Sequence, residues 1–430
     1  FKWCIMPTVD AYPQARQWMA TYQSSDACLT YSDWAGDILQ KQSGGKINYI
    51  GSAPPSAHAA YRPIENKSAL RKAYGVPEGA KIIGTVMRNQ RRKLYPDLFK
   101  SFRKLLDCVD NPHEYFLYCH TSYPDMGWDI PELINTYGLS SHLLMTYMCS
   151  DTNKPFVSMF KGAACQSPYS NKFSGSVCNV KNGVSYENLS EIINLFDVYV
   201  QYANSEGFGL PQVEAAACGV PVMSTDYSAM ESVIRQLGGQ PLAVKAKYKE
   251  LETGCERAVP DNDFTCKCLK EFFDLPESIR KKKGFITRQN FLKHFQWEKS
   301  GAMWESYFDS VEVPDLEKTW LKPVDFRRPQ PKLTNPNEYS TASLARWLIS
   351  NVMCDSSKLN TFFESRLTRD LLYQTATSST GGIYQNESSA AFEGKIQQVD
   401  FNFDIAYSQM INVCNKHNYW ENKRAEVLRK

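Results

Sequence analysis

Residues 196–221 read Phe-Asp-Val-Tyr-Val-Gln-Tyr-Ala-Asn-Ser-Glu-Gly-Phe-Gly-Leu-Pro-Gln-Val-Glu-Ala-Ala-Ala-Cys-Gly-Val-Pro, and this stretch decides the fold. Its alternating apolar residues up to position 200 predict a buried strand. Gly207 and Gly209 permit backbone angles that a side chain would forbid, and Pro211 suits the first position of a helix. A Cys-Gly pair and a second proline stop that helix after roughly two turns. The order of strand, tight loop and short helix predicts an α/β fold.

Two carboxylates, Glu206 and Glu214, flank this glycine-bearing loop eight positions apart. The free amides at the start of the helix form a ready site for phosphate. We expect Glu214 to lie in the first turn, where the helix dipole favours a carboxylate that accepts from two neighbouring hydroxyls, as in a ribose diol. The alternative is an ordinary βα unit with acidic residues near a helix start.

The span from Glu206 to Glu214 resembles the E-x7-E signature of the retaining nucleotide-sugar glycosyltransferases of family 4, which have the two-Rossmann-domain (GT-B) fold. The resemblance implies that Glu206 and the loop after it hold the donor sugar, and that Glu214 binds the ribose. The donor-binding loop residues are Gly207, Phe208, Gly209 and Leu210.

A second segment, Ile82 to Lys93, runs from a β-branched strand into a loop with four cations. Transfer from a sugar nucleotide leaves a diphosphate, and cations aimed at its growing charge stabilise the transition state. In the family an Arg and a Lys five residues apart have this role, and Arg88 and Lys93 match that spacing. We interpret Arg91 and Arg92 as a solvated basic loop.

The chain has 49 basic and 46 acidic residues and a net charge of only +3. This balance lacks the overall positive charge of a polynucleotide-binding protein, although a local nucleic-acid acceptor stays open. No stretch reaches ~18 consecutive apolar residues, so we expect no membrane span.

His120 follows the apolar run Tyr115 to Cys119, which predicts a buried strand. Ligands of open α/β sheets bind beyond the carboxyl ends of strands, so we expect His120 near the nucleotide. A packing or base-contacting role is favoured over that of a catalytic base.

Three cysteines, Cys149, Cys165 and Cys178, lie in a long stretch between two predicted elements. Thr152 and Pro168 stand where a zinc ribbon would have partner cysteines, so the zinc pattern is incomplete. We expect no metal and no cofactor besides the sugar-nucleotide substrate. Thirteen cysteines without a regular framework favour reduced thiols and a cytoplasmic location.

We predict three regions. Residues 1–62 resemble a remnant of the N-terminal, acceptor-binding Rossmann-like domain. Its last strand and serine turn are expected at 26–34, and a linker begins at 47. We expect this half to be truncated, since a whole Rossmann domain needs roughly 120 residues. Residues 63–310 resemble the nucleotide-sugar-binding domain. Residues 311–430 read as a proline-rich linker and a mainly helical extension.

Two further expectations concern the ends of these regions. Asp10, in a Val-Asp-Ala-Tyr-Pro string, is interpreted as a turn residue, and the alternative is that it follows a strand and lines the cleft. Aromatics at helical intervals over 285–310 predict core packing, and Trp297-Glu298 matches a family helix that crosses back to the first domain. The extension either completes the acceptor half, mediates self-association, recognises the acceptor or caps the catalytic domains.

The resulting hypothesis is a metal-independent, retaining transferase in which the acceptor hydroxyl attacks the face that the diphosphate leaves. The donor is a UDP- or GDP-sugar, and a glycan, lipid, protein or modified nucleic acid are all allowed as the acceptor. A nucleotide-sugar epimerase or phosphorylase of the same fold, or a non-catalytic nucleotide-sugar-binding scaffold, remain alternatives.

Overall fold

The computed structural model describes residues 2–179 and 181–312. The chain divides into two compact units, Phe1–Val313 and Pro314–Lys430. The described residues lie in the first unit. The predicted helical extension, and any self-association through it, fall outside the described residues.

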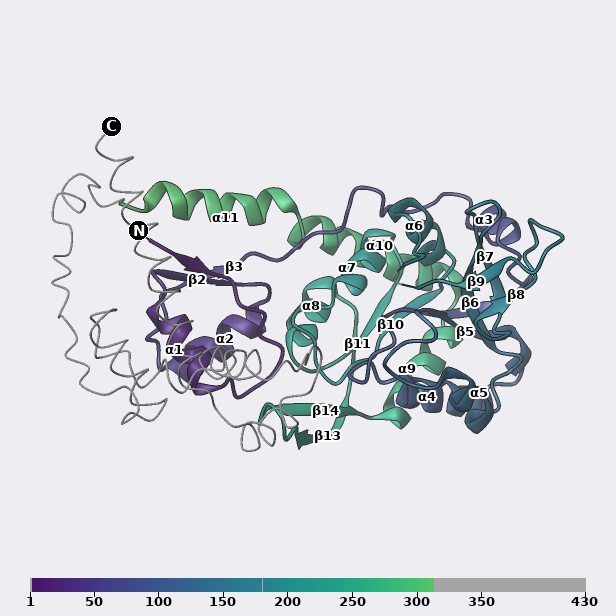
Figure 1. Cartoon of the computed structure of the whole chain (residues 1–430), viewed down its shortest axis with the longest axis horizontal. Helices are drawn as coiled ribbons and strands as arrows, with labels where there is room; N and C mark the ends of the chain where they lie inside the picture. Colours follow the sequence, from purple (N-terminus) through teal and green to yellow (C-terminus); the bar gives the residue numbers. More distant parts are fainter. Residues whose placement is uncertain (1, 180, 313–430) are drawn as a thin grey trace, which may run out of the picture. The chain divides into compact units, whose positions relative to one another are not determined.

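A nine-stranded sheet forms the centre of the larger lobe (Figure 1). Its strand order is β12-β11-β10-β4-β5-β6-β9-β8, with β7 paired to β6. The strands from β12 to β6 are all parallel, and β7, β8 and β9 add an antiparallel edge. The strands are β4 (Lys81–Val86), β5 (Tyr115–His120), β6 (Leu143–Cys149), β7 (Pro155–Met159), β8 (Ala164–Cys165), β9 (Gly175–Val177), β10 (Val198–Gln201), β11 (Val222–Thr225) and β12 (Gln240–Leu242).

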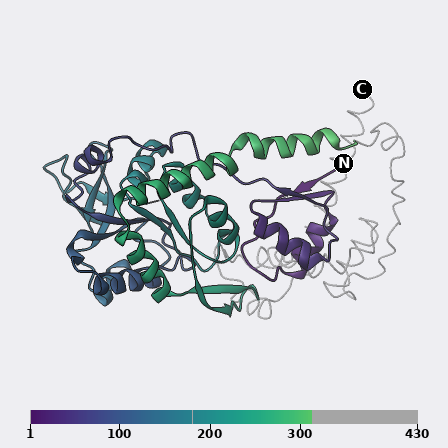
Figure 2. The same ribbon diagram turned by 180° about the vertical axis from the view of Figure 1, so that it is seen from behind.

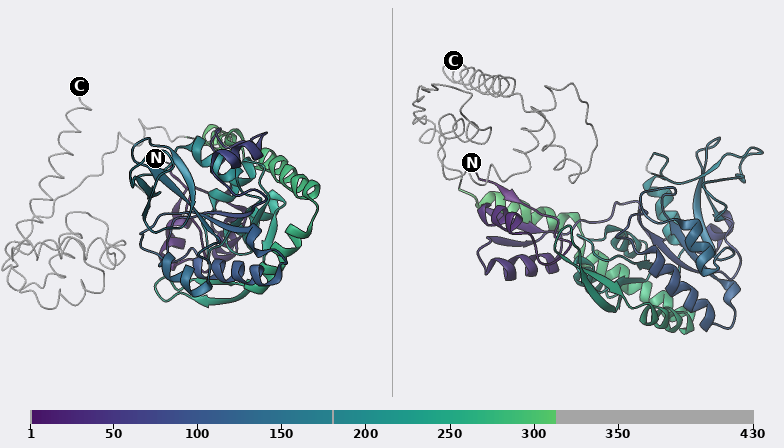
Figure 3. Two further views of the ribbon diagram at one scale, coloured as in Figure 1. Left: turned by 90° about the vertical axis from the view of Figure 1, so that its right-hand side faces the viewer. Right: turned by 60° about the horizontal axis from the view of Figure 1, so that its bottom comes forward.

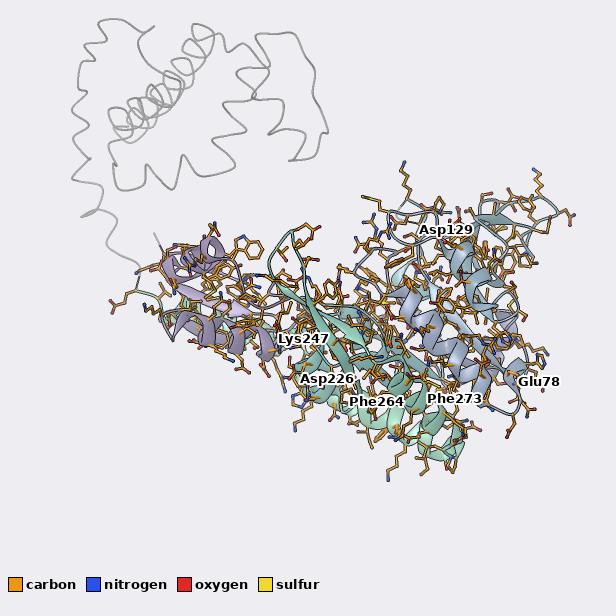
Figure 4. The ribbon with its side chains drawn as sticks, turned by 90° about the horizontal axis from the view of Figure 1, so that it is seen from below. Glu78, Asp129, Asp226, Lys247, Phe264 and Phe273 are labelled. Carbon is orange, nitrogen blue, oxygen red and sulfur yellow. The ribbon has the colours of Figure 1, made fainter. Side chains whose placement is uncertain are left out.

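Helices cover both faces of this sheet. They are α3 (Lys67–Ala73), α4 (Tyr95–Cys108), α5 (Ile130–Tyr137), α6 (Tyr186–Asn194), α7 (Leu210–Ala217), α8 (Ala229–Leu237), α9 (Asn262–Asp274) and α10 (Glu277–His294), and the described part of the chain has one 3-10 turn at Pro112–Glu114. The last described helix, α11 (Trp297–Ser310), lies along the smaller lobe instead. Strand β5 shows why two cores form: Leu117 packs into the cluster beneath α4 and α9, while Phe116 and Tyr118 pack into the cluster beneath α6 and α7. Phe273 on α9, which Figure 4 labels, packs edge-to-face against Tyr115 with the ring centroids 5.2 Å apart.

The smaller lobe is a three-stranded parallel sheet in the order β1-β2-β3 with two helices (Figure 2). Its elements are β1 (Cys4–Ile5), α1 (Arg16–Ser24), β2 (Ala27–Thr30), α2 (Asp33–Ser43) and β3 (Tyr49–Ser52). The serine turn after β2 is confirmed, because the Ser32 hydroxyl accepts a hydrogen bond from the Ala35 N–H at 3.3 Å and caps α2. The expectation that β2 is the last strand is wrong: β3 lies inside the predicted linker and pairs with β2.

The long stretch from 149 to 184 is also more ordered than a loop. Strands β7 and β9 both pair antiparallel with β6, and β8 pairs with β9. Strands β7 and β9 lie on opposite edges of β6, because Tyr147 and Met148 each have a partner in both strands. Strands β6 and β7 form a hairpin, which needs no crossover helix.

The aromatic stripe over 285–310 belongs to two helices rather than one (Figure 3). Phe291 and Phe295 are buried as expected. Phe285, Trp297 and Phe308 are 55–63% exposed, so core packing is wrong for these three. Helix α11 returns to the smaller lobe, where the Ser300 hydroxyl donates to the carbonyl of Pro54 at 2.5 Å. Among the residues at 2–179 and 181–312, no helix has the length and apolarity needed to cross a membrane.

The packing of β4 yields a stability prediction. An added Cβ at the buried Gly84 would overlap the ring of Phe196. We expect Gly84→Ala to lower the free energy of unfolding by about 1–3 kcal/mol because the core cannot accept the methyl group. Gly301→Ala on α11 is the matched control, since no described atom lies within 4 Å of its Cβ position. Equal urea midpoints for the two variants would contradict this prediction.

Candidate active site

A cavity of about 340 Å³ lies at the carboxyl ends of β4 and β5, facing the start of α7. This edge is where ligands of parallel α/β sheets bind, and the volume suits a small molecule. Four of the lining side chains can carry a positive charge: Arg88, Arg92, Lys93 and His120. Pro211, at the start of α7, also lines the cavity.

Main-chain contacts join the two loops that the sequence singles out. Lys93 and Ala203 form an isolated antiparallel bridge. The Leu94 N–H donates to the Tyr202 carbonyl at 3.3 Å, and the Asn204 N–H donates to the Arg92 carbonyl at 3.0 Å. The loop after β4 is therefore fixed against the loop after β10.

This contact brings Lys93 and Glu206 together, 113 positions apart in sequence. The Lys93 ammonium pairs with Glu206 Oε1, and both side chains are only 8% exposed. Gln201 Nε2 donates to the same oxygen at 3.2 Å. Arg92 Nη1 lies 2.6 Å from Glu206 Oε2. The Arg92 side chain is 44% exposed, as expected for a residue of a solvated loop, but its ion pair with the buried Glu206 carboxylate was not predicted.

Burial, and after it the neighbouring guanidinium of Arg92, lower the pKa of Lys93 to about 7. The Glu206 carboxylate opposes this shift. A lysine with a lowered pKa beside a cavity is a common feature of functional sites. Arg91 points elsewhere: its guanidinium lies over the Trp128 ring, 4.9 Å from the centroid.

Arg88 lines the cavity but does not contact Glu206. Its Nε and Nη2 donate to the two oxygens of Asp125 at 2.9 and 3.2 Å. Arg88, with help from the Ser122 hydroxyl, lowers the pKa of Asp125 to about 2, so the carboxylate stays ionised. Asp125 was not predicted, because a lone aspartate in a Tyr-Pro-Asp-Met turn gives no signal of a distant partner.

The glycine loop adopts the conformation that the sequence predicts. Gly209 has a φ of +84° and precedes α7, which begins at Leu210. The Phe208 side chain packs into the core against Phe295, with ring centroids 6.0 Å apart. Within the described chain, no hydrogen bond is found from the N–H groups of Gly207, Phe208 and Gly209. Gly207, Phe208 and Gly209 are not among the residues that line the cavity, and Leu210 is 37% exposed. The donor-binding role of this loop stays a prediction.

Ser228 supports Glu206 and was missed from sequence. Its hydroxyl accepts from the Glu206 N–H at 2.9 Å, and the Ala229 N–H donates to the Glu206 carbonyl at 3.3 Å. Ser228 has a φ of +56°, a strained value for a residue with a side chain. No motif in the sequence marks Ser228 for this role.

Glu214 differs from its predicted setting. Helix α7 begins at Leu210, so Glu214 is its fifth residue and lies outside the first turn. Burial raises the pKa of Glu214 to about 7, although a hydrogen bond from the Tyr61 hydroxyl opposes the rise. The helix dipole therefore does not hold this carboxylate ionised, and Glu214 carries its full charge only above that pH. Glu214 is not among the residues that line the cavity, so its contact with a ribose stays a prediction.

His120 lies at the cavity wall, where the sequence places it. Its Nδ1 is 2.9 Å from the Thr146 hydroxyl, and burial lowers the pKa of the ring to about 4. A neutral imidazole fits a packing or base-contacting role better than proton abstraction.

The cysteine-containing stretch also reaches the cavity, through Cys178, Asn179 and Gly183. Cys149 and Cys165 are instead buried in the core beneath α4. In the part of the chain that the structure describes, no group of three or more His, Cys, Asp or Glu side chains is placed to hold a metal ion.

A parallel sheet of this kind, with cations and a glycine loop at its carboxyl edge, is the architecture of enzymes that bind phosphorylated nucleotides. Residues 171–268 match the family model described as Glycosyl transferases group 1. No curated protein matches the sequence.

Among solved structures, a sucrose-phosphate synthase from Thermosynechococcus elongatus is similar, with 15% identity, a TM-score of 0.51 and coverage of 72% of this chain and 69% of that one. Anabaena HepE, solved with UDP and glucose, has 12% identity, a TM-score of 0.49 and 72% coverage of both chains. A Rickettsia africae glycosyltransferase has 14% identity, a TM-score of 0.47 and coverage of 74% and 70%.

The fold is thus GT-B, as the sequence predicts, and the chain carries a glycosyltransferase group 1 segment. This segment contains α7 and the whole glycine loop. The protein is a glycosyltransferase enzyme.

Proposed function

We propose that the protein is a retaining transferase that moves a sugar from a nucleoside-diphosphate sugar to an acceptor hydroxyl. The observation that carries this proposal is the buried pair of Lys93 and Glu206, with the half-exposed Arg92 beside it, at the edge of the cavity. Two cations can neutralise the diphosphate of a donor, and one carboxylate can accept hydrogen bonds from the hydroxyls of its sugar, on either side of the bond that joins them. The family segment supports the same class of reaction.

In the proposed step the bond between the anomeric carbon and the diphosphate oxygen breaks, and the acceptor oxygen bonds to that carbon from the same face. The acceptor proton passes to the departing diphosphate oxygen. Arg88 and Lys93, together with Arg92, neutralise the charge that grows on the diphosphate. We propose that these cations supply this stabilisation without a metal ion.

Glu206 would exchange partners when the donor binds. With Lys93 and Arg92 turned towards phosphate, its carboxylate is available to the hydroxyls of the sugar. The N–H groups of Gly207 to Gly209, which have no hydrogen-bond partner among the described residues, would add donors for the sugar or the phosphates. Glu214 would anchor the ribose, and His120, at the cavity wall, would contact the base. The donor would be a UDP- or GDP-sugar, and the acceptor a glycan, lipid, protein or modified nucleic acid.

A nucleotide panel tests this function. UDP, GDP, ADP and their common sugar conjugates are compared by thermal shift, and any stabilising donor is followed for hydrolysis and for transfer to an acceptor library. We expect one nucleotide to stabilise the protein and its sugar conjugate to be turned over. Turnover without acceptor to an epimer, or turnover only with inorganic phosphate, would favour the epimerase or phosphorylase. Binding without any turnover would favour the scaffold.

The lowered pKa of Lys93 predicts proton uptake on nucleotide binding. With a pKa of about 7, Lys93 is mostly neutral near pH 8. A diphosphate beside it raises that pKa, so binding should draw up to about one proton from solvent. Calorimetry of UDP binding near pH 8 in buffers of different ionisation enthalpy measures this number. Uptake that persists unchanged in Lys93→Met would contradict the assignment.

A further inference from the structure

The loop after β1 lies directly against the glycine loop. The Thr8 side chain occupies the space that a Cβ on Gly207 would fill. Farther along, the Tyr12 carbonyl accepts from the Glu256 N–H at 2.8 Å, and the Pro13 carbonyl accepts from the Cys255 thiol at 3.0 Å. Residues 8–13 of the smaller lobe therefore form one wall beside Glu206.

Arg257 joins this wall to the glycine loop. It lies on β14 (Glu256–Pro260), which pairs with β13 (Val244–Lys249) in a two-stranded hairpin, where Figure 4 labels Lys247. Arg257 Nη1 lies 2.8 Å from Asp10 Oδ2 and 2.5 Å from the Ser205 hydroxyl. Its Nε and Nη2 donate to Glu250 at 3.1 and 2.7 Å.

This guanidinium is built into the fold rather than left on the surface. Its side chain is 9% exposed, and each of its three guanidinium nitrogens donates to Asp10, Ser205 or Glu250. Burial by itself would lower the pKa of Arg257, but Glu250 and Asp10 together raise it above its ordinary value. Removal of one charged side chain from such a cluster leaves a buried charge without its partner.

The cluster also borders the candidate catalytic groups. Ser205 immediately precedes Glu206 in sequence. Asp10 and Arg257 both lie close enough to Arg92 to act on its charge. The interpretation of Asp10 as a local turn residue is wrong, because its carboxylate accepts from Arg257 and from the Ser205 hydroxyl, nearly 200 positions away.

We propose that Arg257 and Asp10 are positioning residues, which hold Ser205, and through it the Glu206 carboxylate, at a fixed place against the wall of residues 8–13. This inference rests on the proposed function. A shift of the Glu206 carboxylate by about 1 Å would lower the rate of sugar transfer strongly while leaving the diphosphate cations in place. Positioning of this kind affects kcat more than nucleotide binding.

The test compares Asp10→Asn, Ser205→Ala and Arg257→Lys with a control pair, Arg103→Lys and Asp107→Asn. The control residues form an exposed ion pair on α4 at 2.6 Å. Hydrolysis of UDP-glucose, UDP-N-acetylglucosamine, GDP-mannose and ADP-glucose gives kcat and KM, and calorimetry gives the Kd of the free nucleotide. Asp10→Asn and Ser205→Ala keep Arg257 paired with Glu250, so they remain informative if Arg257→Lys does not fold.

We expect kcat to fall about 10- to 100-fold in the three site variants, with the nucleotide Kd within about threefold and the controls unchanged. The double variant Asp10→Asn/Arg257→Lys should be no slower than the slower single variant, because both act through one cluster. Unchanged kcat with a lowered melting temperature would show a purely structural role and overturn the proposal. A parallel loss of nucleotide affinity would overturn it as well. A wild-type protein that turns over none of the donors would instead overturn the proposed function itself.

Discussion

Replacing Lys93 with methionine is expected to lower donor turnover by roughly 100- to 1,000-fold. Lys93 is the buried cation at the cavity, paired with Glu206, and its charge would act on the diphosphate when the sugar bond breaks. Methionine keeps the length of the side chain and removes only the ammonium. The loss should be in kcat as well as kcat/KM, because the diphosphate gains its extra charge in the transition state.

The matched control for this variant is Lys67→Met. Lys67 also pairs with a carboxylate, Asp197, at 3.3 Å, and burial lowers its pKa to about 8, but it does not line the cavity. We expect this control to lose stability and to keep its turnover per folded molecule. Measurements of kcat alongside the folded fraction separate the two effects. Equal turnover in Lys93→Met and Lys67→Met would refute the role of Lys93.

Glu206→Gln is expected to reduce kcat by at least about 100-fold while nucleotide binding stays the same or becomes tighter. The amide keeps the shape of the side chain but removes the charge that orients the sugar. It also releases Lys93 and Arg92 from their ion pairs with this carboxylate, which leaves both cations available for phosphate. A lower kcat together with an unchanged or lower nucleotide Kd is the most specific expectation for this site.

Glu191→Gln provides the comparison. Glu191 accepts a hydrogen bond from the Tyr74 hydroxyl at 2.5 Å and does not line the cavity. Its variant should bind UDP and turn over donor like the wild type. Weaker UDP binding in Glu206→Gln than in this control would mean that Glu206 contacts the phosphates, and the assigned role would fail.

Local patterns in the sequence predict the central elements well. The strand before Glu206, the glycine turn and the short helix after it all appear as β10, Gly209 and α7. The strand and basic loop ending in Lys93, and the strand ending in His120, are also confirmed as β4 and β5. Each rests on contacts between residues a few positions apart, which composition and spacing encode directly.

The errors arise where partners are distant in sequence. The ion pair of Arg92 was missed because its partner Glu206 is more than 100 positions later, and Asp10 reads as a turn because Arg257 is 247 positions later. Strand β3 is short and half-buried throughout, so its pattern resembles a linker. Helix α7 starts one residue before the proline that marks its first turn, which places Glu214 deeper than expected.

The sequence by itself determined the α/β class, the glycine loop and the chemical types of the site residues. Only the tertiary structure decided which charges meet: Lys93 and Arg92 with Glu206, Arg88 with Asp125, and Arg257 with Asp10. The physical reason is that backbone angles and helix caps depend on neighbouring residues, whereas an ion pair depends on where two separate loops end in space. Burial also moves the pKa values of Lys93 and Glu214 to about 7. These shifts depend on the surroundings of each group in the folded protein, so the spacing of residues along the chain cannot predict them.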